Sequence, residues 1–130
     1  MRHLLPTQTW ALMQADPSVV MIDIRMEIES MYVGRPPGAI HVPWYEYPEF
    51  TPNVADFCAV IENELGNKNK TVVLLCRSGQ RSVDAGNALE AAGFTDVVNV
   101  LHGFEGDLDA KFHRSSVNGW RFDGLPWEQM

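Results

Sequence analysis

Residues 71–82 read Thr-Val-Val-Leu-Leu-Cys-Arg-Ser-Gly-Gln-Arg-Ser. The apolar run at 71–75 is typical of a strand that is buried on both faces, as in a parallel sheet. A cysteine follows this strand at once, and we expect a helix from Gln80 to Gly93. A strand, a short loop and a helix in this order are typical of an α/β domain.

The same alternation of strands and helices continues along the rest of the chain. Further apolar runs predict strands at 19–24, 39–42 and 97–101. Helical patterns are expected at 7–15, 51–66 and 102–112, with a single helical turn within 25–33. Thr51 is expected to cap the middle helix, because Pro52 suits a first helical position. The sequence therefore predicts an α/β domain with a mostly parallel central sheet flanked by helices.

The length of 130 residues fits one domain over residues 1–130. Residues 114–130 carry Trp120 and Trp127, and we expect this tail to pack back on the domain because two exposed indoles are costly. No apolar run approaches the roughly 20 residues that cross a bilayer, and we find no secretion signal. We therefore expect a cytoplasmic protein without a membrane partner.

The charge and the cysteines exclude further classes. Ten basic and seventeen acidic residues give a net charge of −7, which argues against a nucleic-acid partner. The two cysteines, Cys58 and Cys76, are expected to be free thiols in a reducing compartment. Neither the cysteines nor the scattered histidines have metal-ligand spacing, so no metal site is expected.

Cys76 has the setting of a nucleophile. In open α/β sheets, ligands bind at the carboxyl ends of the strands, and a tight glycine-containing loop turns backbone N–H groups inward. The start of the next helix adds its positive dipole end, and Arg77 and Arg81 add two charges. These neighbours favour the thiolate, which is the reactive form of cysteine. The segment predicts a thiolate that acts on a small oxyanion.

Four segments resemble the rhodanese-type sulfurtransferases. The loop Cys-x-x-Gly-x-Arg-Ser at 76–82 resembles the active-site loop of that family. Residues 21–27 with 38–43, residues 92–103, and the ending at 119–126 resemble its other signatures. The sequence departs from the family at Gly34-Arg35-Pro36-Pro37, where Gly-His-Ile-Pro is common, and at Phe104 and Leu108. These departures leave the loop intact.

The resemblance implies a rhodanese-like three-layer fold, no cofactor, and a two-step transfer of sulfane sulfur. Cys76 would take sulfur from an anion such as thiosulfate and pass it, as a persulfide, to a thiol, to cyanide or to an acceptor protein. The loop would bind the substrate through Arg77, Ser78, Gly79, Gln80, Arg81 and Ser82. Arg77 would attract the anionic donor, and backbone N–H groups of 77–82 would hold the terminal sulfur.

Two other functions remain alternatives. Cysteine phosphatases and arsenate reductases use five residues between cysteine and arginine, whereas four separate Cys76 from Arg81. A non-catalytic binding module is the second alternative, although such modules often lack the cysteine.

For the other polar and aromatic residues we expect mainly structural roles. Asp23 and Arg25 are expected near the loop as a supporting ion pair, and Arg81 has Asp23 or Glu27 as an alternative partner. Cys58 is expected in the core, on the apolar face of its helix. Residues 44–50 form either a packed aromatic loop or a rim that contacts an acceptor protein.

Overall fold

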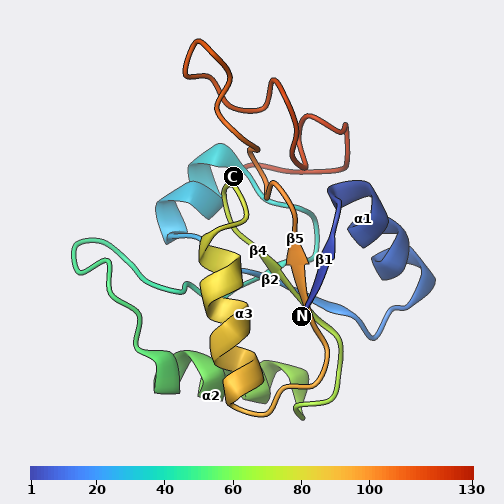
Figure 1. The fold of residues 1–130 in the computed structure, drawn as a ribbon, viewed down its shortest axis with the longest axis vertical. Helices are drawn as coiled ribbons and strands as arrows, with labels where there is room; N and C mark the ends of the chain where they lie inside the picture. Colours follow the sequence, from blue (N-terminus) through green and yellow to red (C-terminus); the bar gives the residue numbers. More distant parts are fainter.

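Five short strands form one sheet in the order β1-β5-β4-β2-β3, and all neighbouring strands are parallel. The computed structural model describes residues 1–130. The strands are β1 (Arg2–Leu4), β2 (Val20–Asp23), β3 (Ile40–His41), β4 (Val72–Leu75) and β5 (Val97–Val100). They place β4 at the centre of the sheet (Figure 1).

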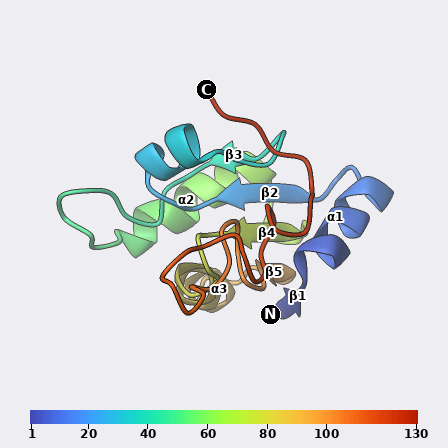
Figure 2. The same ribbon diagram turned by 90° about the horizontal axis from the view of Figure 1, so that it is seen from above.

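Helices cover both faces of the sheet and make three layers. Helices α2 (Val54–Leu65) and α3 (Arg81–Ala91) lie on one side, and α1 (Pro6–Ala15) lies on the other (Figure 2). A short π-helical turn, η1 (Glu29–Val33), follows β2. This arrangement is the predicted three-layer α/β fold, with a sheet that is entirely parallel. No helix of the structure has both the length and the apolar character that a bilayer crossing requires.

The alternation of side chains along β4 divides the core into two clusters. Val72 and Leu74 pack with α2 and α3, whereas Val73 and Leu75 pack toward α1 and the C-terminal segment. All four side chains are fully buried, as the apolar run predicts. Cys76 therefore follows directly after the most buried strand of the sheet.

The C-terminal segment packs on the α1 face. Trp120 is fully buried, meets the ring of Trp10 edge-on at 5.9 Å, and donates its indole N–H to the carbonyl of Pro126 at 2.8 Å. Trp127 is 42% exposed, in contrast to the expectation that both indoles are covered. Its ring meets Phe104 edge-on at 6.2 Å. The segment thus contributes one large side chain to the core.

The structure differs from the sequence-based expectations in three places. Residues 102–112 form turns rather than a helix, because His102, Gly103, Gly106 and Phe112 all have positive φ angles that no right-handed helix accommodates. Asn53, rather than Thr51, caps α2, and its side chain accepts the N–H of Asp56 at 3.2 Å. The edge strand β1 was not predicted, since its three residues carry no apolar alternation.

Candidate active site

Cys76 lies where β4 ends, ahead of α3, and only 1% of it is exposed. Its sulfur accepts a hydrogen bond from the backbone N–H of Gly79 at 3.1 Å and lies 3.2 Å from the Ser82 hydroxyl oxygen. The loop therefore folds back over its own first side chain. This places the sulfur at the carboxyl end of the central strands, where ligands bind in open α/β sheets.

Gly79 makes this loop possible. Its φ angle is +98°, a region that side-chain-bearing residues rarely adopt. A Cβ atom at this position would lie 3.2 Å from the backbone nitrogen of His102 and 3.4 Å from the carbonyl oxygen of Val100. The turn and the close approach both require glycine, and together they aim the Gly79 N–H at the sulfur.

Five other backbone N–H groups of the loop have no acceptor within the protein. The backbone nitrogens of Arg77, Ser78, Gln80, Arg81 and Ser82 donate no hydrogen bond within the protein. The last two belong to the first turn of α3, where the N–H groups have no helical partner and the helix dipole is positive. Unpaired backbone N–H groups in a loop that begins at this sulfur are a setting suited to a small anion.

The two arginines of the loop differ in their surroundings. The Arg77 side chain is exposed and has no ion-pair partner, so its charge is available to a ligand. Arg81 instead donates two hydrogen bonds of 2.8 Å to the carboxylate of Glu29 and lies 5.7 Å from the centre of the Tyr45 ring. Neither Asp23 nor Glu27 is its partner.

The Arg81–Glu29 pair fixes the charge of both side chains. Burial alone would lower the pKa of Arg81, but the hydrogen bonds and charge of Glu29 raise it above its usual value, and the charges of Cys76 and Tyr45 add to this. Burial likewise tends to raise the pKa of Glu29, and the hydrogen bonds and charge of Arg81 lower it below 4.5. Arg81 is thus a permanently charged residue that η1 holds beside the loop.

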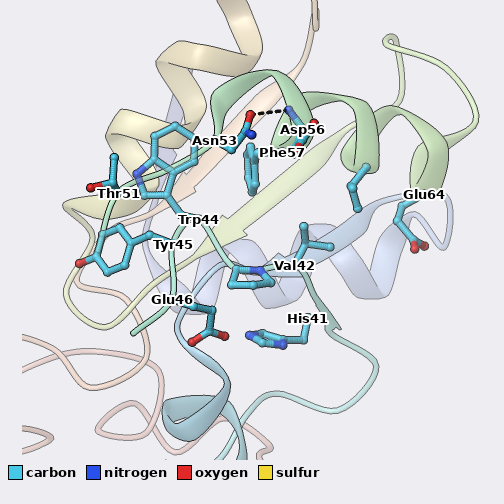
Figure 3. A pocket seen from close by; sticks show the side chains of 12 residues that line it. His41, Val42, Trp44, Tyr45, Glu46, Thr51, Asn53, Asp56, Phe57 and Glu64 are labelled. Carbon is cyan, nitrogen blue, oxygen red and sulfur yellow. Dashed lines mark hydrogen bonds between the residues drawn. The ribbon is translucent and has the colours of Figure 1, made fainter. Parts of the chain in front are cut away.

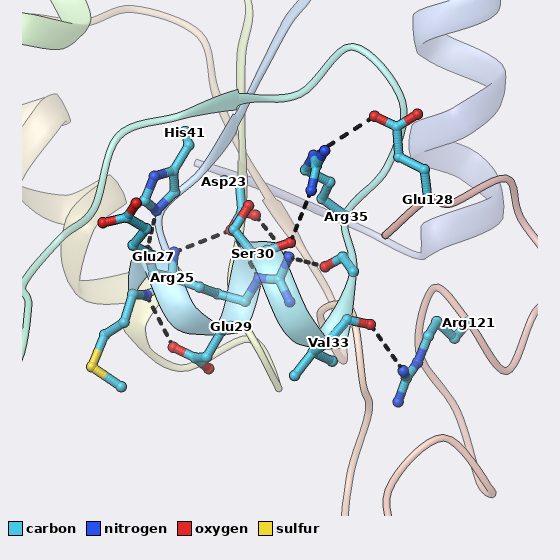
Figure 4. A network of polar contacts seen from close by, with 12 residues as sticks. Asp23, Arg25, Glu27, Glu29, Ser30, Val33, Arg35, His41, Arg121 and Glu128 are labelled. Atoms are coloured by element: carbon cyan, nitrogen blue, oxygen red, sulfur yellow. Dashed lines mark hydrogen bonds and ion pairs between the residues drawn. The ribbon is translucent and has the colours of Figure 1, made fainter. Parts of the chain in front are cut away.

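Asp23 and Arg25 form a second, fully buried ion pair (Figure 4). The Arg25 guanidinium donates to both oxygens of Asp23, at 2.8 and 2.7 Å, and to the carbonyl of Gly34 at 2.6 Å. Its Nη1 atom has no hydrogen-bond partner, and the guanidinium carbon lies 4.5 Å from the centre of the Phe104 ring. Through the Gly34 carbonyl, the pair ties β2 to the loop after η1. No hydrogen bond joins the pair to Cys76.

Ser82 connects the sulfur to a residue that sequence reasoning missed. Its hydroxyl donates to Oδ1 of Asn99, and Nδ2 of Asn99 lies 3.1 Å from Nδ1 of His3. Ser82 and Asn99 are both buried. Asn99 was detectable as the only polar residue within the apolar run of β5. His3 was not, because β1 carries no strand pattern.

The other candidate residues lie outside the hydrogen-bond network around the sulfur. The side chains of Ser78 and Gln80 make no hydrogen bond within the protein. Cys58 is half-buried on α2 against the core, and burial raises the pKa of its thiol although Lys68 opposes this effect. No three His, Cys, Asp or Glu side chains come together as ligands for a metal ion.

Two cavities flank the site without reaching Cys76. One of about 420 Å³ lies between β3 and α2 and includes His41, Trp44 and Asn53 in its lining (Figure 3). The other, of about 650 Å³, is lined by η1 and the aromatic segment and includes Tyr47 and Phe50. Within segment 44–50, Trp44 is thus a core residue, whereas Tyr47 and Phe50 are 74% and 51% exposed.

The chain is similar to proteins of one family along most of its length. The sequence pattern of the rhodanese-like domain matches residues 5–110. Thiosulfate sulfurtransferase GlpE of Haemophilus influenzae is 24% identical over 105 residues, which cover 81% of this chain and 86% of that protein. Protein RC0915 of Rickettsia conorii is 25% identical over 132 residues, covering 98% and 97%. The crystal structure of Rv0390 from M. tuberculosis is 37% identical, covers 100% of this chain and 98% of that one, and superimposes with a TM-score of 0.86.

Proposed function

The chain belongs to the rhodanese-like domain family, and we propose that it is a sulfurtransferase in which Cys76 carries the sulfur as a persulfide. The observation that carries the proposal is the hydrogen bond from the Gly79 N–H to the Cys76 sulfur, in a loop whose other N–H groups donate no hydrogen bond within the protein. The same N–H groups suit a persulfide anion, because its terminal sulfur carries the negative charge and lies one bond further from Cys76.

The reaction is a double displacement at sulfur. The Cys76 thiolate attacks the outer sulfur of a small anionic donor such as thiosulfate, and the sulfur–sulfur bond of the donor breaks. Sulfite leaves with the electron pair of that bond, and a persulfide remains on Cys76. A second thiolate, from a small thiol or an acceptor protein, then attacks the terminal sulfur, and the Cys76 thiolate departs unchanged.

The two arginines of the loop have different roles, because one is unpaired and the other is bound to Glu29. Arg77 is exposed and unpaired, so it attracts an anionic donor to the loop. Arg81 is held by Glu29 and stays next to the sulfur, where its positive charge favours the thiolate and the persulfide anion. We assign Asp23 and Arg25 to support of the adjoining backbone rather than to substrate binding, because their hydrogen bonds close on each other.

The site favours sulfur over phosphate. Four residues separate Cys76 from Arg81, and a phosphoryl group with three oxygens needs a wider ring of N–H groups than a single sulfur does. Sulfur transfer also requires no general acid beside the leaving group, since sulfite is a stable anion.

Exposed Tyr47 and Phe50 offer an acceptor protein an apolar surface on the same side as Arg81. Arg81 lies beside the ring of Tyr45, and that ring meets the ring of Phe50 edge-on.

Mass spectrometry of the intact protein tests the proposal. After incubation with thiosulfate, the wild type is expected to gain the mass of about one sulfur atom, and a thiol is expected to remove it. Cys76→Ser should gain nothing. A wild type that stays unmodified by thiosulfate and by a persulfide donor would contradict the proposal.

A further inference from the structure

A line of hydrogen bonds runs from the sulfur to the edge of the sheet. It passes from Cys76 to Ser82 on α3, then to Asn99 on β5, and ends at His3 on β1. The heavy-atom distances are 3.2 Å between Cys76 and Ser82 and 3.1 Å between Asn99 and His3. The inner three residues are at most 2% exposed, whereas His3 is exposed. The parallel register sets His3 directly beside Asn99.

Each link of this line has a direction. In the structure the Ser82 hydroxyl donates its only proton to Oδ1 of Asn99, so its oxygen can only accept from Cys76. A thiol has a proton to donate, but a thiolate or a persulfide anion has none. The amide of Asn99 meanwhile donates to Nδ1 of His3, which must then carry a lone pair. This direction fits the resting thiol and a His3 ring without a proton on Nδ1.

The opposite direction fits the reactive anion. The Ser82 hydroxyl then donates to the sulfur, its oxygen accepts from Nδ2 of Asn99, and Oδ1 of Asn99 turns to His3. Oδ1 is an acceptor, so Nδ1 of His3 must now hold a proton. Half a turn of one buried amide, which preserves its shape, converts the first arrangement into the second.

We infer that His3 is a positioning residue for Cys76: a proton on Nδ1 of His3 turns the Asn99 amide and makes Ser82 a hydrogen-bond donor to the sulfur anion. This role rests on the proposed function of Cys76 as a nucleophile. The protons balance over the line. The Cys76 sulfur loses one proton as the anion forms, and Nδ1 of the exposed His3 ring gains one from water.

The charged groups nearest the line are paired, with the exception of Arg77. Beside His3, the amino group of Met1 binds Glu90 at 2.7 Å and Arg2 binds Asp96 at 3.0 Å. Beside Cys76, Arg81 binds Glu29. The unpaired Arg77 of the loop acts on the anion directly, and it makes no hydrogen bond to His3, whose ring contacts Asn99. Among the protonatable groups hydrogen-bonded to Asn99, His3 therefore stands alone at the open end of the line.

The rate at which iodoacetamide alkylates Cys76 measures the fraction of this cysteine that is a thiolate. The measurement does not depend on whether the protein transfers sulfur. We would measure it from pH 5 to 9 in a Cys58→Ser background, which leaves one thiol. His3→Leu and Ser82→Ala should each slow alkylation about threefold to tenfold at the acidic end, the effect of one hydrogen bond. The differences between the rates should narrow as the pH rises, because the anion then forms without help from the Ser82 hydroxyl.

The double variant separates this role from a structural one. His3→Leu acts through Ser82, so His3→Leu with Ser82→Ala should be no slower than Ser82→Ala alone. Asn99→Ala cuts the same line at another point and replaces Ser82→Ala if that variant does not fold. His113→Leu removes an exposed imidazole outside the line and should match the wild type.

Two results would overturn the inference. One is an unchanged alkylation profile in His3→Leu. The other is a double variant in which the two effects multiply, since His3 would then act on the sulfur by some route other than Ser82. Loading with thiosulfate, measured separately on the same variants, shows whether the proposed sulfur transfer itself has failed.

Discussion

The backbone N–H of Gly79 donates to the sulfur of Cys76, three residues earlier, across 3.1 Å. The same glycine holds a φ angle of +98°, and a Cβ atom on it would lie 3.2 Å from the backbone nitrogen of His102. The loop therefore joins two features in one residue: a left-handed turn, and an N–H group aimed at the Cys76 sulfur. Neither feature tolerates a side chain.

Gly79→Ala should slow persulfide formation more than it destabilises the protein. The strained φ costs about 1–2 kcal/mol of folding free energy. Moving the Cβ away from the His102 backbone displaces the N–H from the sulfur, and a hydrogen bond to a charged acceptor contributes about 1.5–3 kcal/mol, so loading should slow roughly tenfold or more. The rate of sulfur loading from thiosulfate measures this effect.

Gly66→Ala is the matched control for this variant. Gly66 ends α2 with a φ of +82°, and nothing lies within 4 Å of an added Cβ. It should lower the melting temperature to a similar extent and leave sulfur loading unchanged. If both variants slowed loading equally, backbone strain rather than the Gly79 N–H would be responsible.

The two cysteines should behave differently under substitution. Cys76→Ser should abolish persulfide formation, because a hydroxyl is a far weaker nucleophile at neutral pH. Cys58→Ser should keep most of the activity, since this thiol lies on α2 and donates to the carbonyl of Ala88 on α3. Sulfane sulfur transferred to cyanide is the readout. Equal losses in both variants would make Cys58 a partner in the reaction.

Arg77→Ala should weaken the use of anionic reagents selectively. An exposed, unpaired charge near the sulfur attracts an anion by about 1 kcal/mol in water, or roughly fivefold in rate, and salt screens it. Alkylation by iodoacetate should therefore slow about fivefold at low salt, whereas alkylation by neutral iodoacetamide should hardly change. Arg77→Lys keeps the charge and should preserve the ratio of the two rates. An unaltered ratio in Arg77→Ala would contradict the electrostatic role.

The central part of the fold is predictable from sequence because local pattern and tertiary context agree there. The buried residues of β4 form a continuous apolar run, and Cys76 to Ser82 follow it without an intervening element. Position along the chain then places the loop at the carboxyl edge of the sheet.

The parts that escaped prediction depend on contacts between distant residues. Glu29 reaches Arg81 across 52 positions of sequence, and no local pattern distinguishes it from Glu27. His3 gains its place only when β1 pairs with β5. The predicted helix at 102–112 failed for a different reason: glycines at 103 and 106 take left-handed angles that let the chain cross close to Arg77 and Asn118.

Asp23→Asn should destabilise the protein strongly. The neutral amide cannot match the charge of Arg25, which is fully buried, and removing one partner of a buried ion pair costs about 3–5 kcal/mol. Urea unfolding followed by circular dichroism measures this loss. Asp123→Asn, at an exposed position with no ion pair, should change stability by less than about 0.5 kcal/mol. A small effect of Asp23→Asn would mean that water reaches the pair.

Glu29→Gln should change how stability depends on acid. Arg81 lowers the pKa of Glu29 below 4.5, so the ionised carboxylate stabilises the folded state above that pH, and the contribution is lost as pH falls through the lowered folded value. At pH 7 the variant should melt roughly 4 °C below the wild type, the shift that about 1 kcal/mol produces in a chain of this size. The difference should shrink as the pH falls below 4.5, because the wild type then loses the same charge.

Sulfur loading of Glu29→Gln should also slow, since Arg81 is no longer held beside Cys76. A melting difference that stayed constant from pH 7 to pH 3 would show that the hydrogen-bond geometry, rather than the charge of Glu29, holds Arg81 in place.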